Sequence, residues 1–391
     1  MTLLLTLIVI PVLIPSAMLA IEIAMAFLPA RKQAAIAQPA RVRMAILMPA
    51  HNEASGIADV LDNLQPCLTP EDQLLVVADN CTDSTASIAR AHGATVIERF
   101  HETLRGKGFA LDFGMQHLAA NPPDVVIIID ADCKVEGTKL RPLAEQAIAK
   151  NRPVQALYLM RAPDGAGPNL MLAEFAWLVK NLVRPLGLAR LGLPCPLMGS
   201  GMAFPWPLIR SCDLANGEIV EDLKLGLDLV QAGHPPLFMP EIVITSEFAL
   251  SAAAQNSQRK RWEHGHLGMI LSRFPGLLLT ALTRINLPLL FIALDLAIPP
   301  LALLVLLLLA VSAITCLATL AGAPMLPLIL SLGSLLLVGT TVLAAWWHWH
   351  RNRLSASTLI RIPIYVLRKI PNYLAFMTRR ERSWIKTGRD R

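Results

Sequence analysis

The sequence lacks the cysteine patterns of a metal-binding or disulfide-stapled protein. Its six cysteines include no CxxC pair and no histidine at metal-ligand spacing. Free thiols in a reducing compartment are the interpretation that fits them.

Charged residues are rare or absent in three long stretches of the sequence. Met1–Leu28 contains only Glu22, Leu287–Ala321 contains only Asp295, and residues 325–349 contain no Asp, Glu, Lys or Arg.

These three stretches are each long enough to cross a bilayer. The chain is 54% hydrophobic with a mean hydropathy of +0.50, which excludes a purely soluble protein. We therefore expect a transmembrane helix in residues 1–30, a globular domain in 41–284, two transmembrane helices in 285–350 and a basic tail in 351–391. A cleaved signal peptide is the alternative for the first stretch, but the basic segment that should precede it is absent.

The loop charges predict the orientation. The link between the last two spans, at 322–324, has no charge, whereas basic residues follow the first and the last span. We expect a multi-pass protein of the cytoplasmic membrane, with its N-terminus outside and its central domain and C-terminus in the cytosol. The basic residues are Arg31, Lys32, Arg41, Arg43, Arg351 and Arg353.

The tail after the last span has apolar residues at helical spacing together with positive charge. We expect one or two amphipathic helices lying on the membrane surface, interrupted by Pro363 and Pro371. The net charge of +6 is concentrated in the tail and in the segments next to the spans, which indicates anionic lipids and not nucleic acid as the partner. Asp295 is either a polar contact along an acceptor path or an interfacial residue, and both alternatives stay open.

Between the spans, continuous apolar runs alternate with amphipathic segments. This alternation predicts an α/β domain with a mainly parallel sheet covered on both faces. The strands are expected at 42–48, 74–78, 95–98, 125–129, 155–160 and 237–244, and the helices at 55–65, 82–92, 106–119, 170–183 and 220–231.

Acidic residues follow two of the expected strands. Asp79 comes after the second and Asp130-Ala131-Asp132 after the fourth. Ligands of open α/β sheets bind at the carboxyl ends of strands, so these carboxylates can converge on one ligand. Helix capping is the alternative, and for Asp79 alone the two interpretations are evenly balanced.

Other residues could complete such a site. Asp130 and Asp132 form a DxD element whose oxygens suit Mg²⁺ or Mn²⁺ bound through substrate phosphates. Lys107, between glycines at a helix start, could hold a phosphate. Asp222, after Glu221, could accept a proton from a hydroxyl. Taken singly, Lys107 is better explained as a solvated lysine, and Asp222 as an acid that is favourable at a helix N-terminus because of the helix dipole.

A basic segment, Gln258-Arg259-Lys260-Arg261-Trp262, stands before the second apolar region. It could be a basic turn at the lipid headgroups. In order with the carboxylates, however, it predicts a site in which Arg261 stabilises a departing diphosphate, Gln258 hydrogen-bonds it and Trp262 stacks on a sugar.

Together these elements resemble the membrane-bound, QxxRW-bearing family 2 glycosyltransferases, the branch that includes cellulose, chitin and hyaluronan synthases. The resemblance covers roughly residues 44–265 and implies a GT-A nucleotide-sugar-binding domain. It identifies the catalytic base with Asp222 and the leaving-group contact with Arg261. The donor-binding residues that it implies are Pro49, His51, Glu53, Asp79, Asp130 and Gln258, to which the position of Lys107 at a helix start adds Lys107. The implied acceptor-binding residues are Gly199, Ser200, Gly201 and Trp262, and the implied metal ligands are Asp132 and Asp130.

The implied reaction is a single displacement that inverts the anomeric centre of a nucleotide diphosphate sugar, expected to be UDP-linked. The acceptor is a growing polysaccharide or a lipid, including a glycolipid precursor, and the product belongs to exopolysaccharide or cell-envelope glycan. Three spans are few for a polysaccharide channel in one subunit, so processive secretion does not follow, and other synthase or export subunits are compatible partners. From another class, a catalytically silent nucleotide-sugar-binding scaffold is the alternative.

Overall fold

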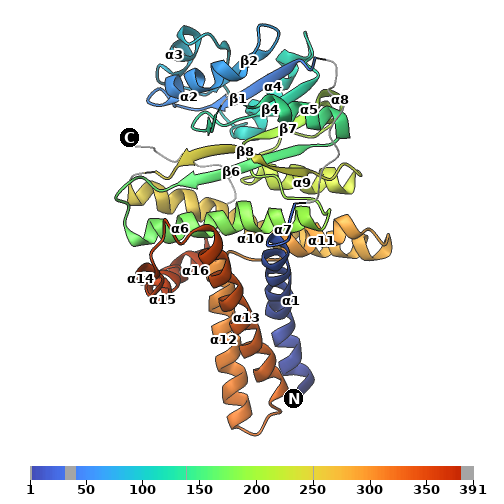
Figure 1. Ribbon diagram of the computed structural model, residues 1–391, viewed down its shortest axis with the longest axis vertical. Coiled ribbons are helices and arrows are strands. Elements are labelled where there is room, and N and C mark those ends of the chain that lie inside the picture. The colour runs from blue at the N-terminus through green and yellow to red at the C-terminus, as the bar shows by residue number, and fades with distance from the viewer. Residues whose placement is uncertain (1, 31–40, 138, 250, 380–391) are drawn as a thin grey trace. The chain divides into compact units, whose positions relative to one another are not determined.

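The computed structural model describes residues 2–30, 41–137, 139–249 and 251–379. These residues form two compact units (Figure 1). The sheet unit comprises residues 41–161 and 194–265, and the helical unit comprises 2–30, 162–193 and 266–379. The division differs from the expected domain limits, because 162–193 and 266–284 group with the apolar helices. Arg31, Lys32 and the end of the tail, 380–391, lie outside the described residues.

The sheet unit contains one eight-stranded sheet with the order β3-β2-β1-β4-β7-β6-β8-β5. Strands β3, β2, β1 and β4 are parallel, as are β6 and β8, whereas β7 is antiparallel to both neighbours and β5 to β8. The predicted α/β class with a mainly parallel sheet is confirmed. The strands are β1 (Met44–Ala50), β2 (Gln73–Asp79), β3 (Thr95–Arg99), β4 (Val125–Ile128), β5 (Lys134–Val135), β6 (Val154–Arg161), β7 (Met202–Pro205) and β8 (Leu237–Glu247).

Both faces of the sheet are covered, as the unbroken apolar runs require. One face packs against α4, α8 and α9 through a core that includes Leu47, Val77 and Phe204. The opposite face packs against α3, where Ala78 meets Ala86. The helices of this unit are α2 (Ile57–Leu64), α3 (Thr85–Ala91), α4 (Lys107–Leu118), α5 (Arg141–Lys150), α8 (Trp206–Arg210) and α9 (Glu221–Gln231).

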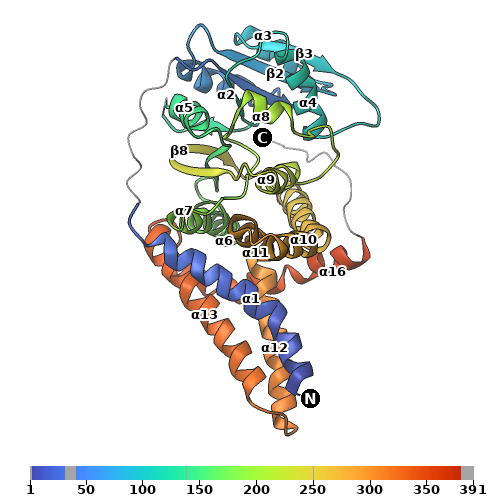
Figure 2. The same cartoon turned by 90° about the vertical axis from the view of Figure 1, so that its right-hand side faces the viewer.

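In the helical unit, α1 (Thr2–Ala26), α12 (Leu301–Leu320) and α13 (Leu326–Trp349) run side by side (Figures 1 and 2). Many of their leucines and isoleucines are exposed, which suits a lipid-facing surface. Among the described residues, four helices are long and apolar enough to cross a membrane: these three and Ala253–Thr283. Their number and length indicate membrane association.

Two features of this unit differ from the prediction. The expected span in Leu287–Ala321 is two helices, α11 (Leu287–Leu296) and α12, because Pro299-Pro300 cannot continue a helix. The basic segment 258–262, for which a turn at the lipid headgroups is one of the two interpretations, is part of one helix, α10 (Ala252–Thr283), which includes the fourth candidate span. That candidate has the lowest mean hydropathy of the four, 1.2, and its charged first turns hid it from the sequence analysis.

A buried group of ion pairs connects α1 and α11 to α7 (Arg184–Arg190). Arg184 donates to Glu22 of α1 at 2.8 Å and to Asp295 of α11 at 2.7 Å. Asp295 is 4% exposed and held by a guanidinium, so it takes part in a buried ion pair and is not an open polar contact. We call Glu22, Arg184 and Asp295 the buried triad.

The segment after α13 also contacts this unit. Arg353 donates to Glu174 at 2.8 Å and to the carbonyl of Ala162 at 3.2 Å. Glu174 belongs to α6 (Pro168–Leu178), which continues through a π-helical turn (Val179–Val183) into α7. The tail then forms three short helices, α14 (Ala356–Leu359), α15 (Ile362–Leu367) and α16 (Ile370–Thr378). Pro363 and Pro371 stand in the first turns of α15 and α16, so they start these helices where a single long helix would have been interrupted.

Candidate active site

The carboxylates predicted to form a site lie at one edge of the sheet. Asp79 is the last residue of β2, and Asp130 follows the end of β4 by two residues. The two strands run parallel with only β1 between them, so their ends are separated by two strand spacings, roughly 10 Å. That separation allows one extended ligand to reach both carboxylates.

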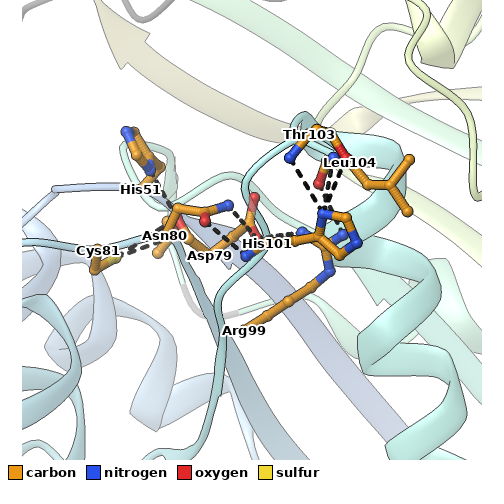
Figure 3. A network of polar contacts seen from close by, with 9 residues as sticks. His51, Asp79, Asn80, Cys81, Arg99, His101, Thr103 and Leu104 are labelled. Carbon is orange, nitrogen blue, oxygen red and sulfur yellow. Dashed lines mark hydrogen bonds and ion pairs between the residues drawn. The ribbon is translucent and has the colours of Figure 1, made fainter.

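Asp79 is held by a network of polar contacts (Figure 3). Its Oδ1 accepts hydrogen bonds from Arg99 Nη1 at 2.6 Å and from Asn80 Nδ2 at 3.0 Å. Its carbonyl oxygen lies 2.6 Å from His51 Nδ1. Both charged side chains of the ion pair are about 10% exposed, so the carboxylate is fixed in place yet still reaches the surface.

The loop after β1 is bound to the loop after β2 over several residues. Asn52 accepts a hydrogen bond from the Thr82 amide at 2.7 Å, and the Glu53 amide donates to Thr85 Oγ1 at 2.8 Å. Pro49 lies within β1, paired with Val77. The structure thus joins His51 and Glu53 to the surroundings of Asp79, while their contacts with a donor stay a prediction.

Lys107, the first residue of α4, is the centre of the second part of the site. Its ammonium lies 2.6 Å from Asp130 Oδ1 and 3.5 Å from Glu221 Oε1, and it donates to the carbonyl of Gly199 at 2.7 Å. Gly199 has φ of +91°, and a Cβ built there would lie 3.2 Å from Asp222 Oδ2 and 3.6 Å from Lys107 Nζ. Both acids of the Glu221-Asp222 pair therefore border the ammonium.

The electrostatics of this cluster follow from its excess of carboxylates. Burial disfavours the Lys107 ammonium, but the neighbouring carboxylates outweigh burial, so the pKa of Lys107 is raised and it stays charged. Burial raises the pKa of Glu221 to about 7, with Lys107 opposing the shift. Burial also raises the pKa of Asp130, again against Lys107. Among these carboxyl groups, Glu221 therefore titrates near neutral pH.

The DxD segment fits a divalent cation. The ligand atoms of Asp130, Asp132 and Cys133 lie within 4.8 Å of one another. Burial raises the pKa of the Cys133 thiol well above its usual range, and a soft sulfur ligand suits Mg²⁺ poorly. The two carboxylates supply the hard oxygens that Mg²⁺ and Mn²⁺ prefer, with further positions open to phosphate oxygens and water.

The segment Gly199-Ser200-Gly201 holds the DxD loop against the sheet. Ser200 is fully buried, and its Oγ accepts a hydrogen bond from the amide of Asp130 at 3.1 Å. The Gly201 amide donates to Ile128 at 2.9 Å. These contacts position the loop that contains the DxD element; the acceptor-binding assignment of the three residues stays a prediction.

The QxxRW residues share one side of α10. Gln258, Arg261 and Gly265 follow one another at intervals of three and four residues, and Trp262 lies beside them. Gly265 fixes where this side packs, since a Cβ there would lie 2.8 Å from Val220 Cγ1. Val220 directly precedes Glu221 and Asp222. The structure therefore brings the start of α10 to the segment that presents the acidic pair.

Three residues of the site were missed by the sequence analysis. Arg99 ends β3, the strand next to β2, and its position after a strand was the available signal. Glu221 was noted only as the neighbour of Asp222, although it is the member of the pair with an ion-pair contact to Lys107. Cys133 follows the DxD directly, but nothing in its spacing distinguishes it from a core thiol.

The chain matches the family model described as "Glycosyltransferase like family 2" over residues 40–265. It is 34% identical over 92 residues to the 4,4'-diaponeurosporenoate glycosyltransferase of Staphylococcus aureus, covering 23% of this chain and 24% of that one. It is 33% identical over 120 residues to an uncharacterised glycosyltransferase of Mycobacterium bovis, covering 26% of this chain and 52% of the other. The aligned parts are thus about a quarter and a half of these relatives.

A solved structure shares the fold over most of the chain. It is the mannosyltransferase PcManGT of Pyrobaculum calidifontis in complex with GDP-Man and Mn²⁺, with a TM-score of 0.54 and 17% identity, covering 95% of this chain and 100% of that one. At this identity the likeness shows the fold, and it confirms the predicted GT-A architecture. Because the family model spans more than half of its length, the chain belongs to the glycosyltransferases of the family 2 type.

Proposed function

We propose that this protein transfers a sugar from a nucleotide diphosphate sugar, with inversion at the anomeric carbon, to a hydroxyl group of a lipid-borne acceptor at the membrane. One observation carries the proposal. Lys107 lies among the carboxylates of Asp130, Glu221 and Asp222 at the carboxyl ends of the strands, two strands away from Asp79. This arrangement supports the proposal because a cation that could hold a diphosphate and a carboxylate that could accept a proton lie side by side.

The donor lies along this edge in the proposed complex. Its base contacts Asp79, with His51, Glu53 and Pro49 forming the wall of that subsite. Its diphosphate is held by Lys107, which exchanges one of its carboxylate partners for phosphate oxygens, and by Gln258. Asp132 and Asp130 would hold a Mg²⁺ or Mn²⁺ ion, which neutralises charge on the diphosphate when bound.

Asp222 acts as the base. It takes the proton of the acceptor hydroxyl, whose oxygen attacks the anomeric carbon from the side opposite the diphosphate. The bond between that carbon and the diphosphate oxygen breaks, and Arg261 donates hydrogen bonds to the departing group. Trp262 offers a flat apolar face to the sugar. Gly199, Ser200 and Gly201 form the floor of the acceptor subsite.

Two observations support a lipid-borne acceptor over a secreted polysaccharide. The described residues contain four candidate membrane helices, of which α10 also carries the QxxRW residues, so few remain to build a polysaccharide channel. A relative that is 34% identical over its aligned part is named for the acceptor 4,4'-diaponeurosporenoate. Export subunits are not needed for such a product.

We propose the orientation with the N-terminus outside and the sheet unit in the cytosol, which requires that α1, α12 and α13 cross the membrane and that α10 lies along its surface. The four charged residues of α10 from Arg259 to Glu263 agree with a surface position. Labelling of single cysteines introduced at residues 322 and 355 in intact cells tests it: only residue 322 should react with a membrane-impermeant reagent.

The function is tested with membranes containing the protein, Mn²⁺ and a panel of radiolabelled nucleotide sugars. We expect label in an organic-soluble product of the opposite anomeric configuration, and no product from Asp222→Asn. Label in an aqueous product of high mass would contradict the acceptor assignment. Nucleotide binding without any transfer across the panel would support the alternative of a silent scaffold.

A further inference from the structure

We infer that Arg99 sets the nucleobase preference of the donor site and selects a uracil nucleotide over a guanine nucleotide. The inference rests on the proposed function, which brings the base to Asp79. It adds a residue and a physical cause that the motifs do not contain.

The carboxylate of Asp79 has only one oxygen available. Oδ1 accepts from Arg99 Nη1 at 2.6 Å and from Asn80 Nδ2 at 3.0 Å, so both of its lone pairs are used. Within the described part of the chain, no hydrogen bond reaches Oδ2. A base that approaches Asp79 therefore meets a single acceptor atom (Figure 3).

The guanidinium of Arg99 is held beside Asp79 by further contacts. Its second nitrogen, Nη2, donates to the carbonyl of Leu104 at 2.8 Å, and its guanidinium lies 5.6 Å from the ring centre of Phe109. The loop that it binds is itself ordered by His101, whose Nδ1 accepts from the amide of Leu104 at 3.0 Å. Releasing Oδ1 would break several of these contacts together, so the arrangement is preorganised.

Uracil and guanine present different numbers of hydrogen-bond donors to a carboxylate. Uracil presents one N–H donor, at N3, between two carbonyl groups. Guanine presents N1–H and the N2 amino group side by side, and these are satisfied by two carboxylate oxygens. With Oδ1 occupied, Asp79 matches the single donor of uracil, whereas guanine would keep one donor unpaired, which is costly in a partly buried site. The likeness to a structure that contains GDP-Man does not decide the base, because it shows the fold alone.

The experiment is a calorimetric titration of the full-length protein in detergent with UDP and with GDP, each with Mn²⁺. We expect wild type to bind UDP roughly 10-fold or more tightly than GDP, the size of one charged hydrogen bond. Arg99→Leu frees one lone pair of Oδ1, enough for a second donor of guanine, and should bring the two affinities to within about threefold. Arg99→Lys retains one donor and should give an intermediate ratio. Arg90→Gln is the matched control, since Arg90 forms an exposed pair with Glu98 and should leave both affinities unchanged.

The outcomes separate this inference from the proposed function. Equal binding of UDP and GDP by wild type, or tighter binding of GDP, would overturn the inference and leave the proposed function standing. Binding of neither nucleotide would overturn both. If Arg99→Leu does not fold, the wild-type ratio and Arg99→Lys still decide. A preference for UDP that survives unchanged in both Arg99 variants would show that another residue selects the base.

Discussion

Two groups of charged side chains in this protein surround a single cation with carboxylates, and they differ in exposure. In the sheet unit, Lys107 lies between Asp130 and Glu221, whose side chains keep 27% and 15% of their exposure. In the helical unit, Arg184 lies between Glu22 and Asp295, whose side chains keep 0% and 6%. The first group is partly exposed, and we propose that it exchanges partners with an incoming phosphate. The second is closed to ligands and holds helices together.

A cation surrounded by carboxylates does not by itself distinguish a catalytic site from a structural ion-pair group. Removing a residue of the open group should change chemistry more than stability, because water can replace the missing partner. Removing a residue of the closed group should change stability more than chemistry, because an unpaired charge is then left without solvent.

Asp222→Asn should reduce sugar transfer by roughly 10²–10⁴-fold, the contribution of a general base, while UDP binding with Mn²⁺ changes little. Initial rates of transfer and calorimetric binding on the same preparation measure this. Asp228→Asn is the control on the same helix, because Asp228 pairs with Lys224 on the outer side. Near-full transfer by Asp222→Asn would show that another residue takes the proton.

Arg184→Leu should destabilise the protein by about 3–5 kcal/mol, since it leaves the buried carboxylates of Glu22 and Asp295 uncompensated. Thermal unfolding in detergent, followed by size-exclusion recovery, measures the loss. Replacing all three residues of the buried triad by leucine should restore much of it. Arg190→Leu is the control on the same helix, since no ion pair of Arg190 occurs among the described residues. An unchanged melting temperature for Arg184→Leu would contradict a structural function of the triad.

Gly265→Ala should lower transfer roughly 10-fold, because its new methyl group would press on Val220 and displace the acidic pair. Val220→Ala in the same chain makes room and should recover most of the rate. Gly276→Ala, on the same helix with no atom within 4 Å of its Cβ position, is the control. Equal losses with and without Val220→Ala would place the effect elsewhere.

Glu221 should make stability depend on pH. Burial raises the pKa of Glu221 from 4.5 to about 7, so the folded protein binds this proton more tightly than the unfolded chain does. The resulting contribution to the free energy of unfolding is complete below about pH 4.5 and is lost as the pH rises through about 7. The melting temperature should therefore fall by roughly 2–4 °C more in wild type than in Glu221→Gln between pH 5 and pH 8. The same scan on Glu218→Gln, an exposed acid just before α9, serves as control. Parallel curves of melting temperature against pH for wild type and Glu221→Gln would show that the titration of Glu221 does not affect stability in this range.

The sheet unit was largely predictable because its signals are local. Runs such as Val125–Ile128 are buried on both faces, so they are continuously apolar and identify themselves as strands of a covered sheet. Strands β5 and β7, with two and four residues, are too short to show a period. The charged first turns of α10 concealed a helix that continues into an apolar stretch.

The contacts that organise the site could not be predicted in the same way. Arg99 and Asp79 are 20 residues apart, and Lys107 and Gly199 are 92 apart. The strand order decides which arginine contacts which carboxylate. The order β3-β2-β1-β4 cannot be deduced from the spacing of the residues along the chain. The same holds for Arg184, whose partners lie 162 and 111 residues away.

From the sequence alone we could infer the α/β class and three of the apolar helices, because hydrophobic period and residue type are properties of neighbouring residues. The contacts came from the three-dimensional fold: Arg99 occupies one oxygen of Asp79, Lys107 is shared among carboxylates, and Asp295 is paired with Arg184. Hydrogen bonds and ion pairs act over a few ångströms in space, whatever the distance along the chain.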